Sequence, residues 1–180
     1  MVSHEAPSGS DLAAQAWQVL ESVCDPEIPV VSLRELGVLR SVTASEVDAP
    51  ARVEVVITPT YSGCPAMGQM EDDVNAALKA AGIAATVRTV LAPAWTTDWI
   101  SDAGKQKLKE YGIAPPGPVT LTGDQPLRFV KPGDKAGMAI PCPKCNSLRT
   151  EQLAAFGSTA CKALYRCLAC QEPFEHFKPI

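Results

Sequence analysis

Four cysteines in the last forty or so residues constrain the fold more than any other feature. They form two C-x2-C pairs, Cys142 with Cys145 and Cys167 with Cys170, and 21 residues separate the pairs. In each pair a tight turn places both sulfur atoms on one side of the backbone, so two facing pairs supply the tetrahedron of thiolates that zinc accepts. Residues 138–180 are too few to stabilise a core alone, so a bound metal contributes much of the folding energy. We therefore predict a structural Zn²⁺ site in a small β zinc ribbon at 138–180.

The pattern does not fix the identity of the metal ion or the role of a fifth cysteine. Iron also suits four thiolates, either as a single ion or in a cluster, although we expect zinc. Cys161 stands too far from Cys167 to form a turn of this kind, which predicts a thiol outside the metal site; a reactive or exchanging ligand is the alternative. Gln171 occupies a position where glycine with positive φ is common, which predicts a strained turn. We expect the strands of the ribbon at 148–156, 162–166 and 174–177.

Charge and composition exclude several classes of protein. The net charge is -4, and lysine and arginine do not cluster: residues 1–137 hold 11 of them against 17 acids, and residues 138–180 hold 5 against 3. A nucleic-acid-binding protein normally brings clustered cations to the phosphates, so we expect no nucleic-acid partner. No apolar run approaches the length of a membrane helix and residues 1–10 do not resemble a signal peptide, so we expect a cytoplasmic protein with no membrane partner and reduced cysteines.

The remainder of the chain predicts a small α+β domain with the order α-β-β-α-β. We expect a flexible N-terminus at 1–10, the domain at 11–112 with helices on one face of a mixed three-stranded sheet, and a Pro-rich linker at 113–137. The expected elements are a helix from Ser10 that Pro26 ends, strands at 36–44 and 52–60, a helix at 65–81, a strand at 83–91 and a helix from 101 to 112 capped by Ser101.

Two features of this domain could carry chemistry. Proline is favoured in the first helical turn, so Pro65 places Cys64 at or beside an N-cap, where the helix dipole favours a thiolate. Cys64 is then a candidate metal ligand or nucleophile, and a small buried cysteine in a tight connection is the alternative. Asp25 and Glu27 lie between prolines in a rigid turn; they could bind metal, but Asp-Pro is equally an ordinary end to a helix.

These motifs resemble known families. The sequences DPEIP at 25–29 and TPTYSGCPA at 58–66 resemble the MIP18 (DUF59) family, whose members assist iron–sulfur cluster assembly and transfer; the match covers residues 11–91. The segments PAWTTDWISDAGKQKLKEYGIAPP and GSTACKALYRCLACQEPFEHFKP resemble the PaaD (also called PaaJ) subunits of phenylacetyl-CoA epoxidase systems.

The resemblance implies an accessory protein of bacterial phenylacetate degradation without a stand-alone enzymatic activity. Its partners would be the reductase and oxygenase subunits of the epoxidase complex, and it would help to mature the iron–sulfur cluster of the reductase. By position in the motif, Cys64 would bind iron or a transient cluster, with Asp25 and Glu27 lining the same site. A homodimer could share the cluster, since one cysteine supplies too few ligands. A non-catalytic structural adaptor is the alternative function, and a thiol-dependent enzyme is disfavoured because the motif supplies no histidine base.

Overall fold

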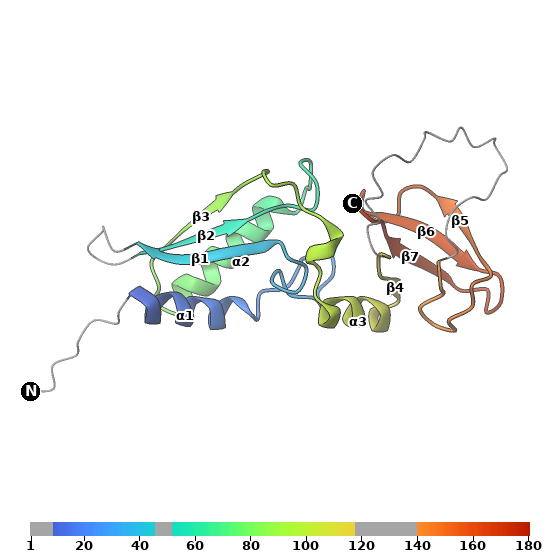
Figure 1. Cartoon of the computed structure of the whole chain (residues 1–180), viewed down its shortest axis with the longest axis horizontal. Coiled ribbons are helices and arrows are strands. Elements are labelled where there is room, and N and C mark those ends of the chain that lie inside the picture. Colours follow the sequence, from blue (N-terminus) through green and yellow to red (C-terminus); the bar gives the residue numbers. More distant parts are fainter. Residues whose placement is uncertain (1–8, 46–51, 118–139) are drawn as a thin grey trace, which may run out of the picture. The chain divides into compact units, whose positions relative to one another are not determined.

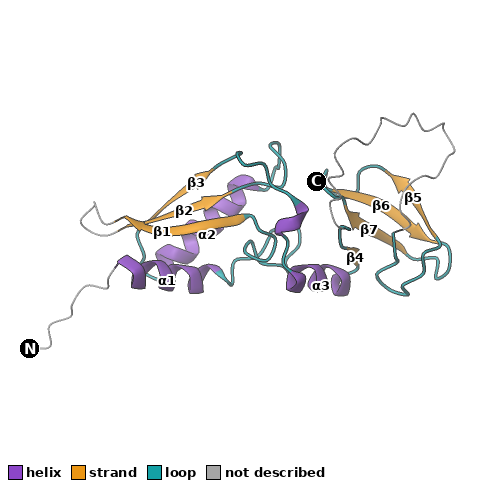
Figure 2. Ribbon diagram, viewed as in Figure 1, coloured by secondary structure: helices purple, strands orange, loops and turns teal. Residues whose placement is uncertain are grey.

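The computed structural model describes residues 9–45, 52–117 and 140–180. The chain divides into two compact units, Met1–Lys107 and Leu108–Ile180. Figures 1 and 2 show the helices and strands of both units. The longest described helix has 14 residues, and no helix within these ranges combines the length and apolarity that crossing a bilayer requires.

The first unit contains a mixed three-stranded sheet. Its strands are β1 (Leu39–Ser45), β2 (Arg52–Ile57) and β3 (Ala85–Thr89), in the spatial order β1-β2-β3. β1 runs antiparallel to β2, and β3 runs parallel to it. The parallel pair requires a crossover, which α2 (Met67–Ala80) provides. This architecture confirms the predicted α+β fold class.

Two helices pack against this sheet and build the core. α1 (Gly9–Leu20) contacts β1, β2 and α2, while α2 also contacts β3, so both helices cover the same face of the sheet (Figure 1). Alternation along β2 buries every second residue, as expected for a sheet covered on one face. The side chains that this packing buries completely include Leu20, Leu33, Val53, Val55, Ile57, Val74 and Leu78.

A short helical region follows the sheet. It consists of a 3₁₀ turn at Thr97–Trp99 and α3 (Asp102–Tyr111). The Ser101 hydroxyl accepts a hydrogen bond from the backbone N–H of Gly104 at 3.0 Å, which confirms the predicted cap. Trp95 is buried, and its indole N–H donates to the carbonyl of Leu36 at 3.0 Å.

Two helix starts differ from the prediction. α1 begins at Gly9, so Gly9 and Ser10 belong to the helix rather than to a flexible N-terminus; residues 1–8 of that predicted segment lie outside the described residues. α2 begins at Met67, with Ala66 as its N-cap. The helix prediction placed Pro65 in the first turn because proline tolerates that position, but the chain uses it in a turn before the helix.

The second unit contains a four-stranded sheet in the order β4-β7-β6-β5. β5 (Thr150–Ala154), β6 (Lys162–Cys167) and β7 (Pro173–Phe177) form an antiparallel meander in the predicted regions. β4 (Ile113–Ala114) adds parallel to β7 and was not predicted. The first residues of the predicted 113–137 linker are therefore part of the ribbon sheet, and residues 118–137 lie outside the described residues.

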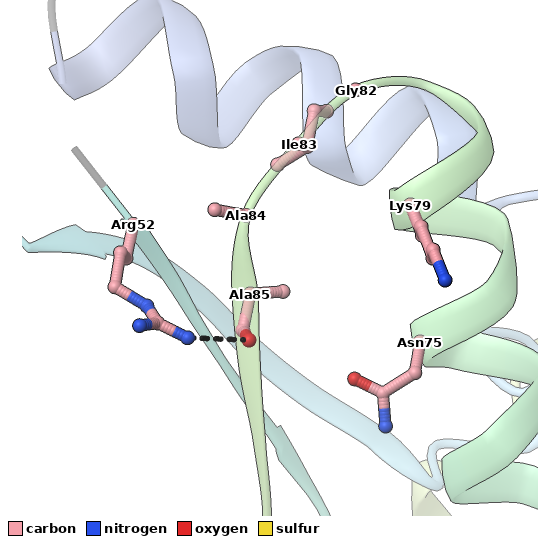
Figure 3. Close-up of a pocket in the computed structure, with 7 residues that line it drawn as sticks. All are labelled: Arg52, Asn75, Lys79, Gly82, Ile83, Ala84 and Ala85. Carbon is pink, nitrogen blue, oxygen red and sulfur yellow. Dashed lines mark hydrogen bonds between the residues drawn. The ribbon is translucent and has the colours of Figure 1, made fainter. Parts of the chain in front are cut away.

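A shallow pocket lies at one end of the first unit (Figure 3). It is lined by Arg52, Asn75, Lys79 and residues 82–85, and Arg52 donates to the carbonyl of Ala85 at 3.4 Å. No cysteine, histidine or carboxylate lines this pocket. The candidate chemistry of the chain therefore has to be sought elsewhere.

Candidate metal centre and the Cys64 loop

Each C-x2-C pair occupies a turn held by the same backbone hydrogen bond. The N–H of Cys142 donates to the carbonyl of Ser147 at 3.0 Å, and the N–H of Cys167 donates to that of Glu172 at the same distance. Both bonds join the first cysteine to the fifth residue after it. The two turns are therefore matching loops that each present two sulfur atoms.

The residue after each second cysteine has a left-handed backbone conformation. Asn146 has φ 57° and Gln171 has φ 65°, which confirms the positive φ predicted at Gln171. Asparagine tolerates this region well, whereas glutamine has no such advantage. The equivalent conformation at Asn146 was missed, although asparagine directly after a C-x2-C pair is a sequence signal that could have predicted it.

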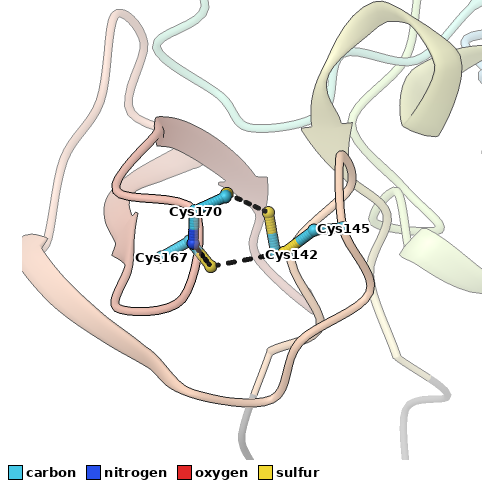
Figure 4. A group of neighbouring side chains, drawn as sticks. All are labelled: Cys142, Cys145, Cys167 and Cys170. Atoms are coloured by element: carbon cyan, nitrogen blue, oxygen red, sulfur yellow. Dashed lines mark hydrogen bonds between the residues drawn. The ribbon is translucent and has the colours of Figure 1, made fainter.

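The four sulfur atoms are spaced for a single metal ion. All four lie within 4.8 Å of one another, with 3.8 Å between Cys142 Sγ and Cys170 Sγ and 3.5 Å between Cys145 Sγ and Cys167 Sγ. A tetrahedral ion with metal–sulfur bonds of about 2.3 Å requires sulfur–sulfur distances of about 3.8 Å. Figure 4 shows both pairs converging on one point, so the donor set fits a four-coordinate metal.

Backbone donors favour a thiolate in this centre. The N–H groups of Cys170 and Ala169 donate to Cys167 Sγ at 3.5 and 3.4 Å. The hydrogen bond from the Cys170 N–H has the largest effect on the pKa of the Cys167 thiol, and the bond from the Ala169 N–H acts in the same direction. Together they lower this pKa to about 6, although burial raises it. Thiolates are the form that binds metal, so the second turn already supports one ligand in its reactive form.

The centre is buried on one side and exposed on the other. Cys142 and Cys167 are completely buried beside Ala114 and Phe174, whereas Cys145 and Cys170 are exposed. Ile140 and Tyr165 pack against the same cluster. The inner sulfur atoms thus join the metal centre to the apolar core of the ribbon, and the outer ones face solvent.

Cys161 lies outside this group. Its sulfur is 3.0 Å from the Thr159 hydroxyl, and it is not among the four ligands that converge. This position agrees with the prediction of a thiol outside the metal site, while a reactive or exchanging ligand stays the alternative; within the described residues, Cys161 belongs to no other ligand cluster.

Asp25 organises its own turn. One carboxylate oxygen, Oδ1, accepts hydrogen bonds from the backbone N–H groups of Glu27 and Ile28, each at 2.8 Å. The residue is 6% exposed, whereas Glu27 is exposed. The contacts of Asp25 Oδ1 are those of a side chain that stabilises a tight turn.

Cys64 lies in the loop between β2 and α2. Its N–H donates to the carbonyl of Tyr61 at 3.2 Å, and its carbonyl accepts from the N–H of Met67 at 3.4 Å, so two consecutive turns place its half-buried side chain. It precedes the N-cap, Ala66, by two residues. The full helix-dipole effect expected at a capping position therefore does not apply to it, because that effect falls off within the first turn.

The structure does not assemble Cys64, Asp25 and Glu27 into a metal-binding group by themselves. Within the described residues, the one group of three or more converging ligand atoms consists of the four ribbon cysteines.

Both units match known protein families. Residues 13–92 match the model of an iron–sulfur cluster assembly protein family, and residues 130–178 match that of the PaaD zinc beta ribbon domain. A crystal structure of a domain of unknown function, DUF59, from Bacillus anthracis is 30% identical, with a TM-score of 0.50; the match covers 56% of this chain and 94% of that chain. The fold and the site thus define a class: a domain of the iron–sulfur assembly type joined to a zinc ribbon.

The family follows from a longer match. Over 168 residues, 92% of each chain, the sequence is 39% identical to an Escherichia coli (strain K12) protein that is provisionally named as a subunit of 1,2-phenylacetyl-CoA epoxidase. The chain belongs to the PaaD family.

Proposed function

We propose that this chain is an accessory subunit of a phenylacetyl-CoA epoxidase system and assists the assembly or insertion of an iron–sulfur cluster in the reductase component. The observation that carries the proposal is the match of residues 13–92 to iron–sulfur cluster assembly proteins, in a chain that aligns over 92% of its length with a relative named as an epoxidase subunit. The chain itself would not oxidise the ring, and it would act in the cytoplasm.

Cys64 is the residue proposed to hold iron or a cluster during this process. It is half-buried, lies outside the ribbon centre, and occupies a loop between two rigid elements. Asp25 and Glu27 would line the same site, with Asp25 Oδ1 also fixing the turn that carries Glu27. The remaining ligands would come from a client protein or a second copy of the chain, and ligands shared in this way suit transient holding.

We propose zinc as the resident ion of the ribbon. Four sulfur atoms at the spacing of one tetrahedral ion support this assignment. A closed set of four protein ligands leaves no position for substrate, so the ion would stabilise the ribbon fold. Metal and acid-labile sulfide analysis of protein purified without oxygen tests this assignment, and one zinc per chain is expected. In a Cys64→Ser variant, any iron at the proposed Cys64 site would be lost. Iron in place of zinc in that variant would therefore refute zinc as the ribbon ion.

The test of the maturation role is a Cys64→Ser variant co-expressed with the reductase component. We expect the iron and sulfide content of the purified reductase to fall while assembly of the oxygenase complex persists. Cys161→Ser is the matched control, because Cys161 is also a half-buried thiol outside the four-cysteine group and lies in the other unit. A reductase with full cluster content in the Cys64→Ser strain would sink the maturation role and leave a structural adaptor as the function.

A further inference from the structure

Three of the exposed large apolar side chains of the ribbon lie along one strand, while Ile180 is exposed at the C-terminal end. Leu148 is 61% exposed, Leu153 49% and Phe156 65%, and all three lie in β5 or within two residues of it. We call these three residues the β5 rim. Single exposed apolar residues are ordinary, but several along one short segment indicate a binding surface.

β5 is also an edge strand, and a β-bulge in it explains why Leu153 is exposed. It is the last strand in the order β4-β7-β6-β5, so within the described residues its outer side pairs with no strand. Its register with β6 shifts between Gln152 and Ala154, which leaves Leu153 as the extra residue of a β-bulge. A bulge bends the strand and redirects a side chain, and here it presents Leu153 to solvent.

Among the charged side chains of residues 140–180, cations outnumber carboxylates. Each acidic side chain between residues 140 and 180 forms an ion pair within the ribbon: Glu151 with Arg166, Glu172 with Lys144, and Glu175 with Lys162. The two remaining cations of that segment, Arg149 and Lys178, form no ion pair with any described residue. Both cations lie beside the rim.

The two cations stand at opposite ends of the rim. Arg149 follows Leu148 directly at the beginning of β5. The Lys178 ammonium lies 4.5 Å from the centre of the Phe156 ring and donates to the carbonyl of Ala155 at 3.3 Å. The rim thus combines three exposed apolar side chains along one segment with a cation near each end that forms no ion pair with a described acidic side chain.

We propose that the β5 rim binds an extended segment of a partner protein that carries apolar side chains in its middle and a carboxylate near each end. An extended strand rises about 3.3 Å per residue, so a segment of about nine residues would reach from Leu148 to Phe156. The carboxylates would face Arg149 and Lys178, and the apolar side chains would cover Leu153 and its neighbours. This surface would act whether or not Cys64 carries iron.

Charge also decides against a second copy of the chain as the occupant. Antiparallel pairing of two β5 strands would place Arg149 of one copy near Lys178 of the other at both ends. Like charges directly opposite one another destabilise a strand pair. An acidic partner segment removes this conflict.

The proposal can be tested with two fluorescently labelled peptides of nine residues and the full-length protein. Both peptides alternate valine or leucine with threonine, and one carries glutamates at both ends where the other carries lysines. Fluorescence anisotropy at low salt should show the glutamate peptide binding at least about tenfold more tightly, and this preference should shrink as salt is added.

Variants of the full-length protein locate the binding. Leu153→Asp should weaken binding of the glutamate peptide at least about tenfold, and Arg149→Glu or Lys178→Glu about fivefold each. Leu91→Asp is the matched control, since Leu91 is 57% exposed and lies in the other unit; it should change nothing. Metal content and circular dichroism verify that each variant is folded.

Three results would overturn the proposal, two from peptide binding and one from the oligomeric state. One is equal affinity for both peptides, and another is affinity for the glutamate peptide that Leu153→Asp leaves unchanged. The third is a wild-type dimer in analytical ultracentrifugation that Leu153→Asp converts to a monomer, because this would assign the rim to a second copy of the chain.

Discussion

Replacing His176 with phenylalanine should stabilise the ribbon, and increasingly so as the pH falls. His176 lies in β7, is 4% exposed, and its Nε2 has no hydrogen-bond partner among the described residues. Its ring meets the Tyr165 ring edge-on at 5.6 Å, a contact that phenylalanine can retain. An unsatisfied buried polar atom costs about 1–3 kcal/mol, so His176→Phe should raise the free energy of unfolding by about 1 kcal/mol at neutral pH.

The pH dependence follows from the buried imidazole. Burial lowers the pKa of His176 from 6.5 to about 4. The unfolded chain therefore takes up a proton at a higher pH than the folded chain does, and stability is lost as the pH falls from about 6.5 toward about 4. Between about pH 7.5 and about pH 5 this linkage amounts to about 2 kcal/mol, so the advantage of the variant should grow to about 3 kcal/mol.

Hydrogen exchange of the β6 and β7 amides, read at both pH values, measures this difference within the ribbon. Acid also protonates the thiolates of the metal centre, but it does so in both proteins, so the comparison with wild type isolates the imidazole. Tyr165→Phe, which keeps His176, is the control and should retain the full pH dependence. A wild-type-to-variant difference that stays constant between the two pH values would refute the reasoning, as would a loss of stability at neutral pH.

Three further predictions concern the turns and the metal. Gln171→Gly should raise ribbon stability by about 1 kcal/mol, because glycine adopts φ 65° without steric cost. A urea titration in which hydrogen exchange of the ribbon amides is measured would show this gain. Asn146→Gly should change the stability less. Asp25→Ala should cost about 2 kcal/mol through the loss of two hydrogen bonds, whereas Glu27→Ala, at an exposed position, should stay within about 0.5 kcal/mol in the same urea titration. Removing the metal with a chelator should abolish exchange protection in β5, β6 and β7 but leave that of β1, β2 and β3, since each sheet belongs to a compact unit of its own. Loss of protection in both units would contradict this.

The sequence predicts the ribbon centre well because its information is local. A C-x2-C pair closes its own turn, and four thiolates admit few ions, so spacing alone assigns Cys142, Cys145, Cys167 and Cys170 to one site. β5 and β6 connect the two pairs and β7 directly follows the second pair, so the positions of the pairs indicate where the strands of the meander lie. β4 has two residues and pairs with β7 across more than fifty residues of chain, so no local pattern could reveal it.

The first unit shows where local patterns mislead. Pro65 is compatible with a first helical turn and with an ordinary turn, and the choice depends on hydrogen bonds that the sequence does not display. The motif around Asp25 could equally predict a ligand or a turn, and the structure shows the turn through two backbone donors to Oδ1. Cys64 belongs to no group of three or more converging ligand atoms within the described residues, so neither spacing nor fold determines its role.

The unequal burial of the four cysteines sets an order of events for metal exchange. Because Cys145 and Cys170 are exposed while Cys142 and Cys167 are buried, a competing chelator or an oxidant reaches one sulfur of each pair first. Such an attack would release the outer half of a turn, while the inner sulfur would stay in the apolar core beside Ala114 and Phe174. We therefore expect the ribbon to lose its metal stepwise, through an intermediate held by the two inner cysteines, and to recover it readily when the outer thiols are reduced again.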